Sequence, residues 1–332
     1  MPTAGREWQL VRRPSGWPVA EDVALVDVDV PDPGAGQVLV RNLYLSVDPY
    51  MRGRMNAAAS YAAPYQIGKA MYGGAVGQVV SSRDDGVPEG AFVRTGKAWR
   101  THALARREEI EILDGGVPLP SYLGVLGMPG LTAWVGVHDI GEVRPGETVW
   151  VSAASGAVGT LAGQLARAAG CRVIGTAGGP AKAKMLVDDL GFDAGIDYHA
   201  GDLAGQVRAA APDGVDVYFD NVGGAHLQAA LEVLNPLGRV IACGMISDYN
   251  ERSPGPDNLF LIVGKKLTVR GFIVSDHAHR TAVFTRHVTA LLEKGEITYP
   301  ETVVHGIEST FEAFLSLLRG GTHVGKLVVQ TA

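Results

Sequence analysis

Cysteine is scarce in this chain, and long apolar runs and clusters of positive charge are absent. The two cysteines, Cys171 and Cys243, each lie in an apolar stretch, which favours reduced core thiols over a disulfide framework. No stretch reaches about 18 consecutive apolar residues, and the first residues lack the apolar core of a signal peptide, so we expect a soluble cytoplasmic protein without a membrane partner. The net charge of −6 without a basic block argues against nucleic acid and leaves a small molecule as the expected partner.

A catalytic metal is also not expected. A zinc site needs cysteine, histidine and carboxylate ligands that converge tetrahedrally. Residues 1–122 contain no cysteine and a single histidine, His102, and the other histidines are scattered along the chain. We therefore predict neither a catalytic nor a structural zinc site.

Glycine and proline are plentiful, with 44 and 18 residues, and they separate segments of two kinds. Before residue 122, short segments such as 37–42 and 75–81 alternate apolar and polar residues, which predicts an antiparallel β-rich lobe. From residue 148, apolar runs alternate with Ala- and Leu-rich helical stretches, which predicts βαβ units and a parallel sheet. The six strands expected in this sheet cover 148–153, 172–176, 194–197, 215–220, 238–243 and 267–272.

The chain is long for a single core, so we expect two domains. A helix near 281–294 is followed by an alternating tail that ends in 326–330 and returns to the first lobe. We predict an α/β fold with a catalytic β-rich domain over 1–122, completed by 297–332. A doubly wound nucleotide-binding domain over 123–296 is inserted into it.

The segment VWVSAASGAVGTLAGQLARAAG carries the clearest chemical signal. A β-branched strand runs into Ala154, Gly156 and Gly159 and then into a helix. The missing side chains let the backbone approach a pyrophosphate, which the positive end of the helix dipole stabilises. Because the strand, the turn, the helix and the next strand are all present, a dinucleotide site is favoured over a purely structural turn.

The end of the second strand in this domain, residues 175–179, bears on the choice of cofactor. NAD-specific sites usually place a carboxylate there for the ribose 2′-hydroxyl. No carboxylate occurs between residue 175 and Asp188, whereas Lys182 and Lys184 lie just beyond the turn. A 2′-phosphate would meet positive charge, so NADPH is favoured. Spacing alone is equally consistent with Lys182 as a solvated helix residue.

Six motifs together carry a family resemblance over nearly the whole chain: LYLSVDPYMRGRM (43–55), MPGLTAW (128–134), AASGAVG (153–159), GFDAGIDY (191–198), YFDNVGG (218–224) and CGMISDYN (243–250). With them the chain resembles the medium-chain dehydrogenase/reductase superfamily, in its zinc-independent leukotriene B4 dehydrogenase, prostaglandin reductase and curcumin reductase branch. The resemblance implies a GroES-like β-rich lobe, an inserted Rossmann domain and a homodimer. It also implies NADPH-dependent reduction of the carbon–carbon double bond of α,β-unsaturated ketones or aldehydes, without zinc.

The resemblance further implies a set of cofactor contacts. The turn over 156–159 is expected at the pyrophosphate, Lys182 and Tyr198 at the 2′-phosphate, and Asn221 at the nicotinamide half. In the tail motif, this chain has His323 where the family usually has Asn, and an imidazole differs in shape from an amide. The full implied set is Gly156, Ala157, Val158, Gly159, Lys182, Tyr198, Asn221, Cys243, Gly244, Ile246, Ser247, Tyr249, Phe272, Ile273, Val274 and His323.

Without a metal, hydrogen-bond donors must stabilise the oxyanion that develops when hydride reaches the β-carbon of an enone. Tyr249 follows a strand end, where ligands bind in such sheets, so its phenol is the first candidate for donor and proton relay. The resemblance implies that Tyr50 lines the same cleft from the other lobe. The nicotinamide ribose hydroxyl is an alternative donor, and aromatic packing is an alternative role for both tyrosines.

Substrate contacts are expected from Tyr50, from Met128, and from Tyr61 and Tyr65 in a Pro-, Ala- and Tyr-rich stretch that would form a mobile lid. Two other enzymatic hypotheses stay open, which are quinone reduction and oxidation of an allylic alcohol. A non-catalytic NADPH-binding sensor is a third. Turnover of NADPH against enones and quinones would separate these hypotheses.

Overall fold

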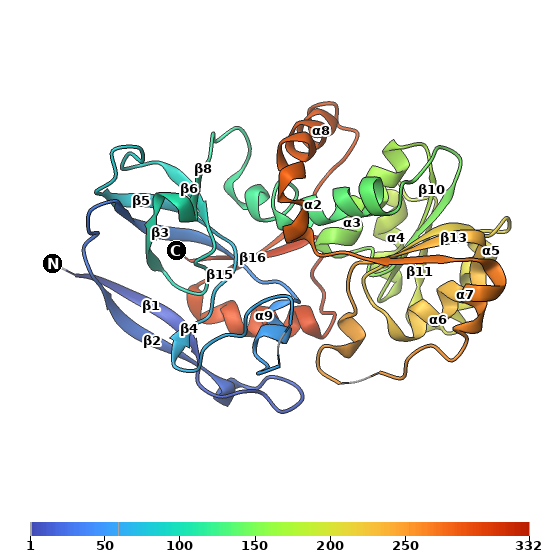
Figure 1. Ribbon diagram of the computed structural model, residues 1–332, viewed down its shortest axis with the longest axis horizontal. Helices are drawn as coiled ribbons and strands as arrows, with labels where there is room; N and C mark the ends of the chain where they lie inside the picture. The colour runs from blue at the N-terminus through green and yellow to red at the C-terminus, as the bar shows by residue number, and fades with distance from the viewer. Residues whose placement is uncertain (1, 59, 252, 332) are drawn as a thin grey trace. The chain divides into compact units, whose positions relative to one another are not determined.

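Segments that are distant in the sequence assemble each of two structural units. The computed structural model describes residues 2–58, 60–251 and 253–331 (Figure 1). The first unit consists of the chain up to Leu123, Glu301–His323 and the tail from Leu327, and the second consists of Gly124–Pro300 and Val324–Lys326. The divisions at 123/124 and 300/301 lie close to the expected ones at 122/123 and 296/297.

The first unit is rich in antiparallel β-structure, as expected. Its strands are β1 (Thr3–Leu10), β2 (Val23–Val30), β3 (Gln37–Ser46), β4 (Lys69–Ala70), β5 (Ala75–Ser82), β6 (Phe92–Thr95), β7 (His102–Arg106), β8 (Ile110–Ile112), β15 (Glu301–His305) and β16 (Lys326–Gln330). One sheet has the order β2-β1-β4, and a larger one has the order β15-β16-β3-β5-β6-β8 with β7 paired to β3. Alternate residues of a strand share a face, so Val38, Val40, Val79 and Val93 meet in a buried core.

Helices in the described part of the first unit are short. They are α1 (Met51–Arg54), α9 (Thr310–Leu318) and the 3-10 turns η1 (Ala20–Asp22), η2 (Arg107–Glu109), η3 (Leu119–Leu123) and η8 (Ile307–Ser309). The apolar face of α9 is buried, and its Phe314 packs edge-on against the buried Trp99, with ring centroids 5.7 Å apart. This aromatic pair packs α9, from the C-terminal part of the chain, against the N-terminal part of the first unit.

The second unit contains a parallel sheet. Its strands are β9 (Thr148–Val151), β10 (Arg172–Ala177), β11 (Ala194–Asp197), β12 (Val215–Asp220), β13 (Leu234–Ala242) and β14 (Thr268–Gly271). All neighbouring strands pair in parallel, in the order β11-β10-β9-β12-β13-β14. This is the doubly wound arrangement, in which the strand order reverses between β9 and β12. The predicted fold class is confirmed.

Two strand ends differ from the expected ones. β9 stops at Val151, two residues early, because the chain turns sharply and Ala153 adopts a positive φ of 46°. β13 begins at Leu234 and not at residue 238. The segment Asn235-Pro236-Leu237-Gly238 has the composition of a turn, but it continues the strand through an irregularity in the pairing with β12.

The second unit also contains helices, most of which connect strands of this sheet. They are α2 (Met128–Val135), α3 (Ala157–Ala168), α4 (Pro180–Asp188), α5 (Leu203–Ala210), α6 (Gly224–Val233), α7 (Phe260–Lys265) and α8 (Thr281–Glu293), with the π-helix η4 (Gly136–Ile140) and the 3-10 segments η5 (Tyr198–Ala200), η6 (Ile246–Asp248) and η7 (Val274–Arg280). α8 coincides with the helix expected over 281–294. Among the described residues, no helix has the length and apolar character needed to cross a bilayer.

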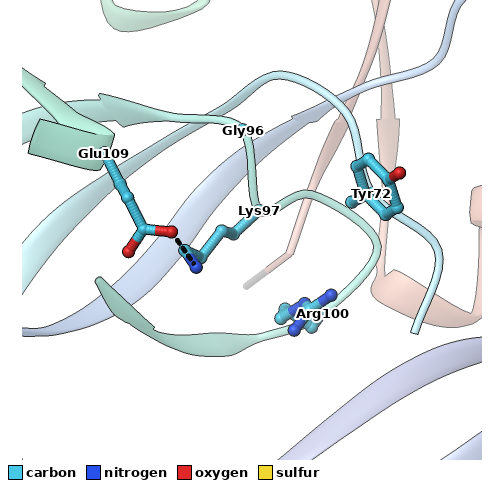
Figure 2. Close-up of a pocket in the computed structure, with 5 residues that line it drawn as sticks. All are labelled: Tyr72, Gly96, Lys97, Arg100 and Glu109. Carbon is cyan, nitrogen blue, oxygen red and sulfur yellow. Dashed lines mark ion pairs between the residues drawn. The ribbon is translucent and has the colours of Figure 1, made fainter. Parts of the chain in front are cut away.

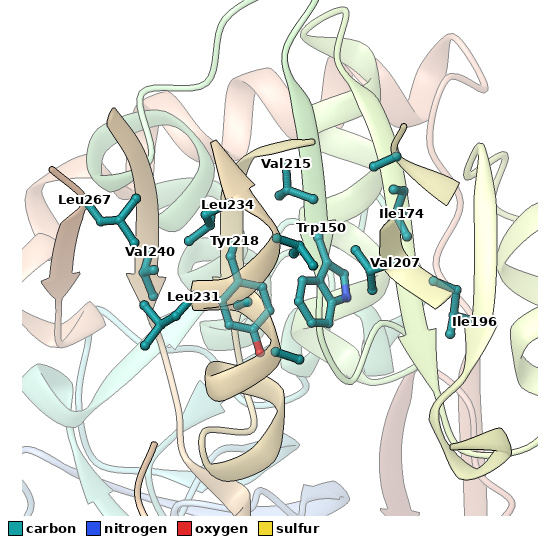
Figure 3. Close-up of a cluster of buried hydrophobic side chains, with 14 residues drawn as sticks. Trp150, Ile174, Ile196, Val207, Val215, Tyr218, Leu231, Leu234, Val240 and Leu267 are labelled. Atoms are coloured by element: carbon teal, nitrogen blue, oxygen red, sulfur yellow. The ribbon is translucent and has the colours of Figure 1, made fainter. Parts of the chain in front are cut away.

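An aromatic pair lies in the core of the second unit. The rings of Trp150 on β9 and Tyr218 on β12 are fully buried with centroids 4.5 Å apart, and Figure 3 shows them packed side by side. Aliphatic residues from the neighbouring elements, including Ile174 and Val240, complete the cluster. Such a pair contributes about 1 kcal/mol beyond its area of burial, and here it holds together the two strands at which the order reverses.

Candidate functional site

The glycine-rich turn after β9 has the geometry that a close backbone approach requires. A Cβ atom built on Gly159 would lie 2.4 Å from the carbonyl oxygen of Ala153, so only glycine fits there. Gly156 precedes α3 in an extended conformation and supplies no side chain as a cap. The N–H groups of Ala157 and Val158 therefore begin the helix with their usual capacity for an anion.

The tail segment lies against the same turn within the second unit. The N–H of Gly325 donates to the carbonyl oxygen of Ser155 at 2.8 Å, and Gly325 forms an isolated bridge with Gly156. Gly325 has a φ of 67°, and a Cβ atom on it would lie 1.8 Å from the carbonyl oxygen of Pro300. His323 is partly buried and directly precedes this segment in the chain.

Two rings from η5 lie over the end of β10. A Cβ atom on Gly178 would lie 3.1 Å from the Tyr198 hydroxyl and 3.2 Å from Cε1 of His199. Lys182 lies in the first turn of α4, and partial burial lowers its pKa from the ordinary value. Lys184 is instead exposed and pairs with Asp188. His199 was not among the site residues predicted from the sequence. Its position next to Tyr198 in the chain could have indicated it.

A carboxylate that the sequence reasoning missed also lies near the end of β10. Asp197 ends β11, the strand beside β10, and so lies outside the segment 175–188 that bears on the cofactor in the sequence. Its Oδ1 accepts hydrogen bonds from the N–H of Gly179 at 2.8 Å and of His199 at 3.0 Å. The Gly179 hydrogen bond lowers the pKa of Asp197. The side chain of Asp197 therefore stabilises the turn after β10 by accepting a hydrogen bond from the backbone N–H of Gly179.

A polar network joins β9 to β12 where the strand order reverses. The Asn221 N–H donates to Ser152 Oγ at 2.9 Å, and the Asn221 side-chain amide donates to the Ser152 carbonyl oxygen at 2.8 Å. Asp220 is fully buried, and its Oδ1 accepts a hydrogen bond from the Tyr218 hydroxyl at 2.8 Å. Asn221, expected at the nicotinamide half, is thus held by two bonds at the carboxyl edge of the sheet.

The loop after β13 is tied to the turn after β12. The N–H groups of Cys243 and Gly244 donate to the carbonyl oxygen of Asp220 at 2.9 and 3.0 Å. Further along, the Ile246 N–H donates to Asn221 at 3.3 Å, and the Ser247 N–H donates to Val222 at 3.1 Å. Burial raises the pKa of the Cys243 thiol to about 12, so this side chain stays neutral.

Tyr249, the first candidate for hydrogen-bond donor, lies close to two other expected site residues. A Cβ atom on Gly244 would lie 3.7 Å from the Tyr249 hydroxyl and 3.4 Å from the carbonyl oxygen of Asn221. Tyr249 itself is partly buried at the end of η6. The structure therefore brings Asn221, Gly244 and Tyr249 into one cluster.

The remaining expected residues of the second unit flank its sheet. Phe272, Ile273 and Val274 are partly buried between β14 and η7. Met128 begins α2 and is 38% exposed.

The expected tyrosines of the first unit have three different environments. Tyr50 is half-buried, and its pKa is raised by burial and by the Asp48 charge, while Arg54 opposes the rise. Tyr61 is 63% exposed. Tyr65 is 1% exposed and donates from its hydroxyl to the carbonyl oxygen of Tyr72 at 2.7 Å. The expectation that Tyr65 contacts substrate from a lid is therefore corrected, because its ring and hydroxyl are used in packing.

A cavity of about 450 Å³ lies in the first unit, lined by Tyr72, Gly96, Lys97, Arg100 and Glu109 (Figure 2). The ammonium of Lys97 pairs with Glu109 at 2.8 Å across it. The lining includes none of the residues that the sequence assigned to the site. Over the described ranges, no group of three or more His, Cys, Asp or Glu side chains is arranged to hold a metal ion.

Comparison with known proteins places the chain among oxidoreductases. It matches family models described as the N-terminal domain of oxidoreductase, over residues 6–113, and as zinc-binding dehydrogenase, over residues 157–292. It is 42% identical over 335 residues to the NADPH-dependent curcumin reductase of Escherichia coli (strain K12), covering 98% of this chain and 97% of that protein. It is 39% identical to the 2-alkenal reductase (NADP(+)-dependent) of Nicotiana tabacum, with 96% and 95% covered. Its fold matches CurA from Vibrio vulnificus, solved in complex with NADPH, with a TM-score of 0.94, 42% identity and coverages of 98% and 99%.

Proposed function

We propose a substrate class for this chain, which belongs to the zinc-independent branch of the medium-chain dehydrogenase/reductase family and is an NADPH-dependent oxidoreductase. Its proposed reaction is reduction of the carbon–carbon double bond of an α,β-unsaturated ketone or aldehyde. The observation that carries the proposal is the cluster of Asn221, Gly244 and Tyr249, which presents a phenol at the carboxyl end of a doubly wound sheet. The names of the Escherichia coli and Nicotiana tabacum relatives support the same substrate class.

The residues at the sheet edge fit NADPH. The turn at Gly156–Gly159 leaves the room that a pyrophosphate needs, because a side chain at Gly159 would collide with the backbone. Lys182, Tyr198 and His199 offer an ammonium, a phenol and an imidazole near the end of β10, where a 2′-phosphate would be bound. Asn221 and the loop 243–249 would hold the nicotinamide half.

The chain's own residues would orient the substrate and stabilise charge. When bound, NADPH would supply the hydride for the β-carbon, and a proton from solvent would complete the reduction at the α-carbon, with the Tyr249 phenol as its proposed relay. Tyr249 donates a hydrogen bond from its phenol to the substrate carbonyl, whose oxygen gains negative charge as the double bond is reduced. Tyr50 is proposed as a second donor, and Tyr61 and Met128 as substrate contacts.

The test is oxidation of NADPH, with NADH in parallel, against enones, enals, quinones and simple ketones after treatment with a chelator. Chelator-resistant turnover of enones or enals with NADPH preferred supports the proposal. Turnover of quinones alone makes the protein a quinone reductase, and oxidation of allylic alcohols with NADP⁺ as the dominant reaction makes it a dehydrogenase. Binding of NADPH without turnover of any of these makes it a sensor.

A homodimer is proposed as the assembly, formed through the exposed edge of the parallel sheet. β14 ends the strand order, pairs only with β13 among the described strands, and is exposed along its whole length. The preceding helix α7 has no buried residue, with Phe260 80% and Val263 70% exposed. An unprotected strand edge beside exposed apolar side chains is typical of a surface that a second copy covers through a two-fold axis.

A further inference from the structure

We propose that Asp220 is a positioning residue for hydride transfer, whose buried carboxylate sets the geometry of the two loops that carry Asn221 and Tyr249. The inference rests on the proposed function, because it assigns a role within the same cofactor site. Asp220 acts through the backbone and through neighbouring side chains, and no contact with the substrate is invoked.

Asp220 lies on one of the two central strands of the parallel sheet. Asp220 ends β12, which pairs with β9 in the middle of the sheet. The strand order reverses between these two strands, with β10 and β11 on one side and β13 and β14 on the other. Connections from the carboxyl ends of the strands diverge at such a point, and doubly wound folds bind their ligands there. The side chain is fully buried at the point where the proposed cofactor site begins.

The carboxylate of Asp220 shapes the turn after β12 through its hydrogen bonds. Its Oδ1 accepts hydrogen bonds from the N–H of Val222 at 2.9 Å, from the N–H of Gly223 at 2.8 Å and from the Tyr218 hydroxyl at 2.8 Å. Gly223, which precedes α6, and Gly224, which begins it, both have positive φ, at 74° and 48°. A single oxygen atom therefore fixes a sharp turn that includes Asn221.

Backbone hydrogen bonds connect this turn to the loop that carries Tyr249, the candidate hydrogen-bond donor. The main-chain carbonyl of Asp220 accepts hydrogen bonds from Cys243 and Gly244, and the next two residues of the turn accept from the loop 243–249 as well. The Tyr249 hydroxyl lies over Gly244 in this loop. A shift of the turn would therefore move the phenol, since the loop is attached to it at four backbone hydrogen bonds.

The second carboxylate oxygen of Asp220, Oδ2, makes the burial of this side chain energetically unfavourable. Asp220 Oδ2 is buried and has no hydrogen-bond partner among the described residues. Burial raises the pKa of Asp220, against the hydrogen bonds from Gly223 and Val222 that lower it. A buried carboxylate with an unsatisfied oxygen is destabilising compared with an apolar side chain of similar size. Packing alone does not explain an aspartate here, whereas a need for a strong acceptor at Oδ1 does.

The experiment compares Asp220→Ala and Asp220→Asn with the wild type, using Asp216→Ala as the matched control. Asp216 lies on the same strand at its opposite end, where its Oδ2 accepts from the Thr148 N–H at 2.9 Å. Both alanine variants thus remove a carboxylate of β12 that accepts a hydrogen bond from a backbone N–H. Asp220→Asn keeps an oxygen acceptor for the turn and serves as the conservative variant if Asp220→Ala is poorly folded.

The measurements are kcat and KM with NADPH and with NADH, the isotope effect with deuterated NADPH, the fluorescence of bound NADPH, and the thermal midpoint. For Asp220→Ala we expect kcat to fall about 100-fold with a larger isotope effect, because displacement of reacting groups by about 1 Å costs this much. The ratio of the KM values for NADPH and NADH should not change, since the 2′-phosphate is recognised at the end of β10. Asp220→Asn should recover most of kcat, and Asp216→Ala should lower the thermal midpoint without lowering kcat.

Two results would overturn the inference. One is a kcat for Asp220→Ala no lower than that of Asp216→Ala. The other is a change in the NADPH to NADH ratio as large as the change in kcat. A wild-type protein that turns over no enone would contradict the proposed function instead, and the fluorescence of bound NADPH would still report whether Asp220 orients the nicotinamide.

Discussion

Trp134 donates a hydrogen bond from Nε1 to Nδ1 of His287 at 2.9 Å, which joins α2 to α8 in the second unit. The ring of His138 packs against both partners, with centroids 4.9 Å from Trp134 and 5.4 Å from His287. Burial lowers the pKa of His138 to about 4. His226, which is buried, also has its pKa lowered by burial to about 4. Both imidazoles are neutral in the folded protein near neutral pH.

These histidines predict a loss of stability in acid. The unfolded chain binds their protons near pH 6.5 and the folded chain only near pH 4, so the stability present above pH 6.5 is lost as the pH falls through this window. For His226 the loss should be about 2 to 3 kcal/mol between pH 7 and pH 4. Urea unfolding at both pH values should show a smaller loss for His226→Phe. The exposed His305 provides the control, since His305→Phe should behave as the wild type.

Gly159→Ala should weaken NADPH binding and folding together. The added Cβ would meet the backbone of Ala153 at 2.4 Å, which cannot move without opening the turn. We expect the free energy of unfolding to fall by about 1 to 3 kcal/mol, together with a weaker fluorescence titration by NADPH. Gly264→Ala in α7 meets nothing within 4 Å, and should stabilise by up to about 1 kcal/mol through helix propensity. Equal behaviour of the two variants would contradict the role of Gly159.

Lys182→Ala should raise KM for NADPH and leave KM for NADH unchanged. A charge-assisted hydrogen bond contributes about 1.5 to 3 kcal/mol, so the rise should be about 10-fold or more and should shrink at high salt. Lys184→Ala on the same helix is the control, because Lys184 is exposed and pairs with Asp188. A similar loss for NADH would show that Lys182 does not read the 2′-phosphate.

Tyr249→Phe should lower kcat while KM for NADPH stays the same. Removal of one donor at the developing oxyanion is expected to cost up to about 100-fold in kcat. Steady-state rates with an enone measure this, and Tyr44→Phe on β3 of the other unit should have no effect. An unchanged kcat would assign the donor role to the nicotinamide ribose hydroxyl.

Val269→Arg should convert the proposed dimer to monomers. Val269 lies on the exposed edge strand β14, and a charged side chain there opposes edge-to-edge pairing. Sedimentation equilibrium of the wild type and the variant measures the change in mass. Val303→Arg, on an exposed position of β15, is the control that should keep the wild-type mass. A monomeric wild type would refute the dimer directly.

Much of the second unit could be predicted because its signals are local. Apolar runs of strand length, separated by helical stretches, determine all six parallel strands, and the spacing of Gly156 and Gly159 determines the turn. The expected start of β13 is wrong for a non-local reason, because Leu234 pairs with Val215 ahead of an irregularity at 235–238, where Leu237 keeps the positive φ of 67° typical of a turn. The pairing of Leu234 depends on a neighbouring strand and has no counterpart in the segment itself.

By itself, the sequence determined the fold class and the glycine-rich turn, and it predicted Tyr249 as the phenol of the site, since each depends on residues within a few positions of one another. Only the tertiary structure decided the roles of three other residues. The Tyr65 hydroxyl donates to the backbone of Tyr72, His199 in η5 lies over Gly178, and the backbone carbonyl of Asp220 accepts hydrogen bonds from a loop more than 20 positions later. Hydrogen bonding and burial between distant segments are set by how the chain packs, and no local pattern records them.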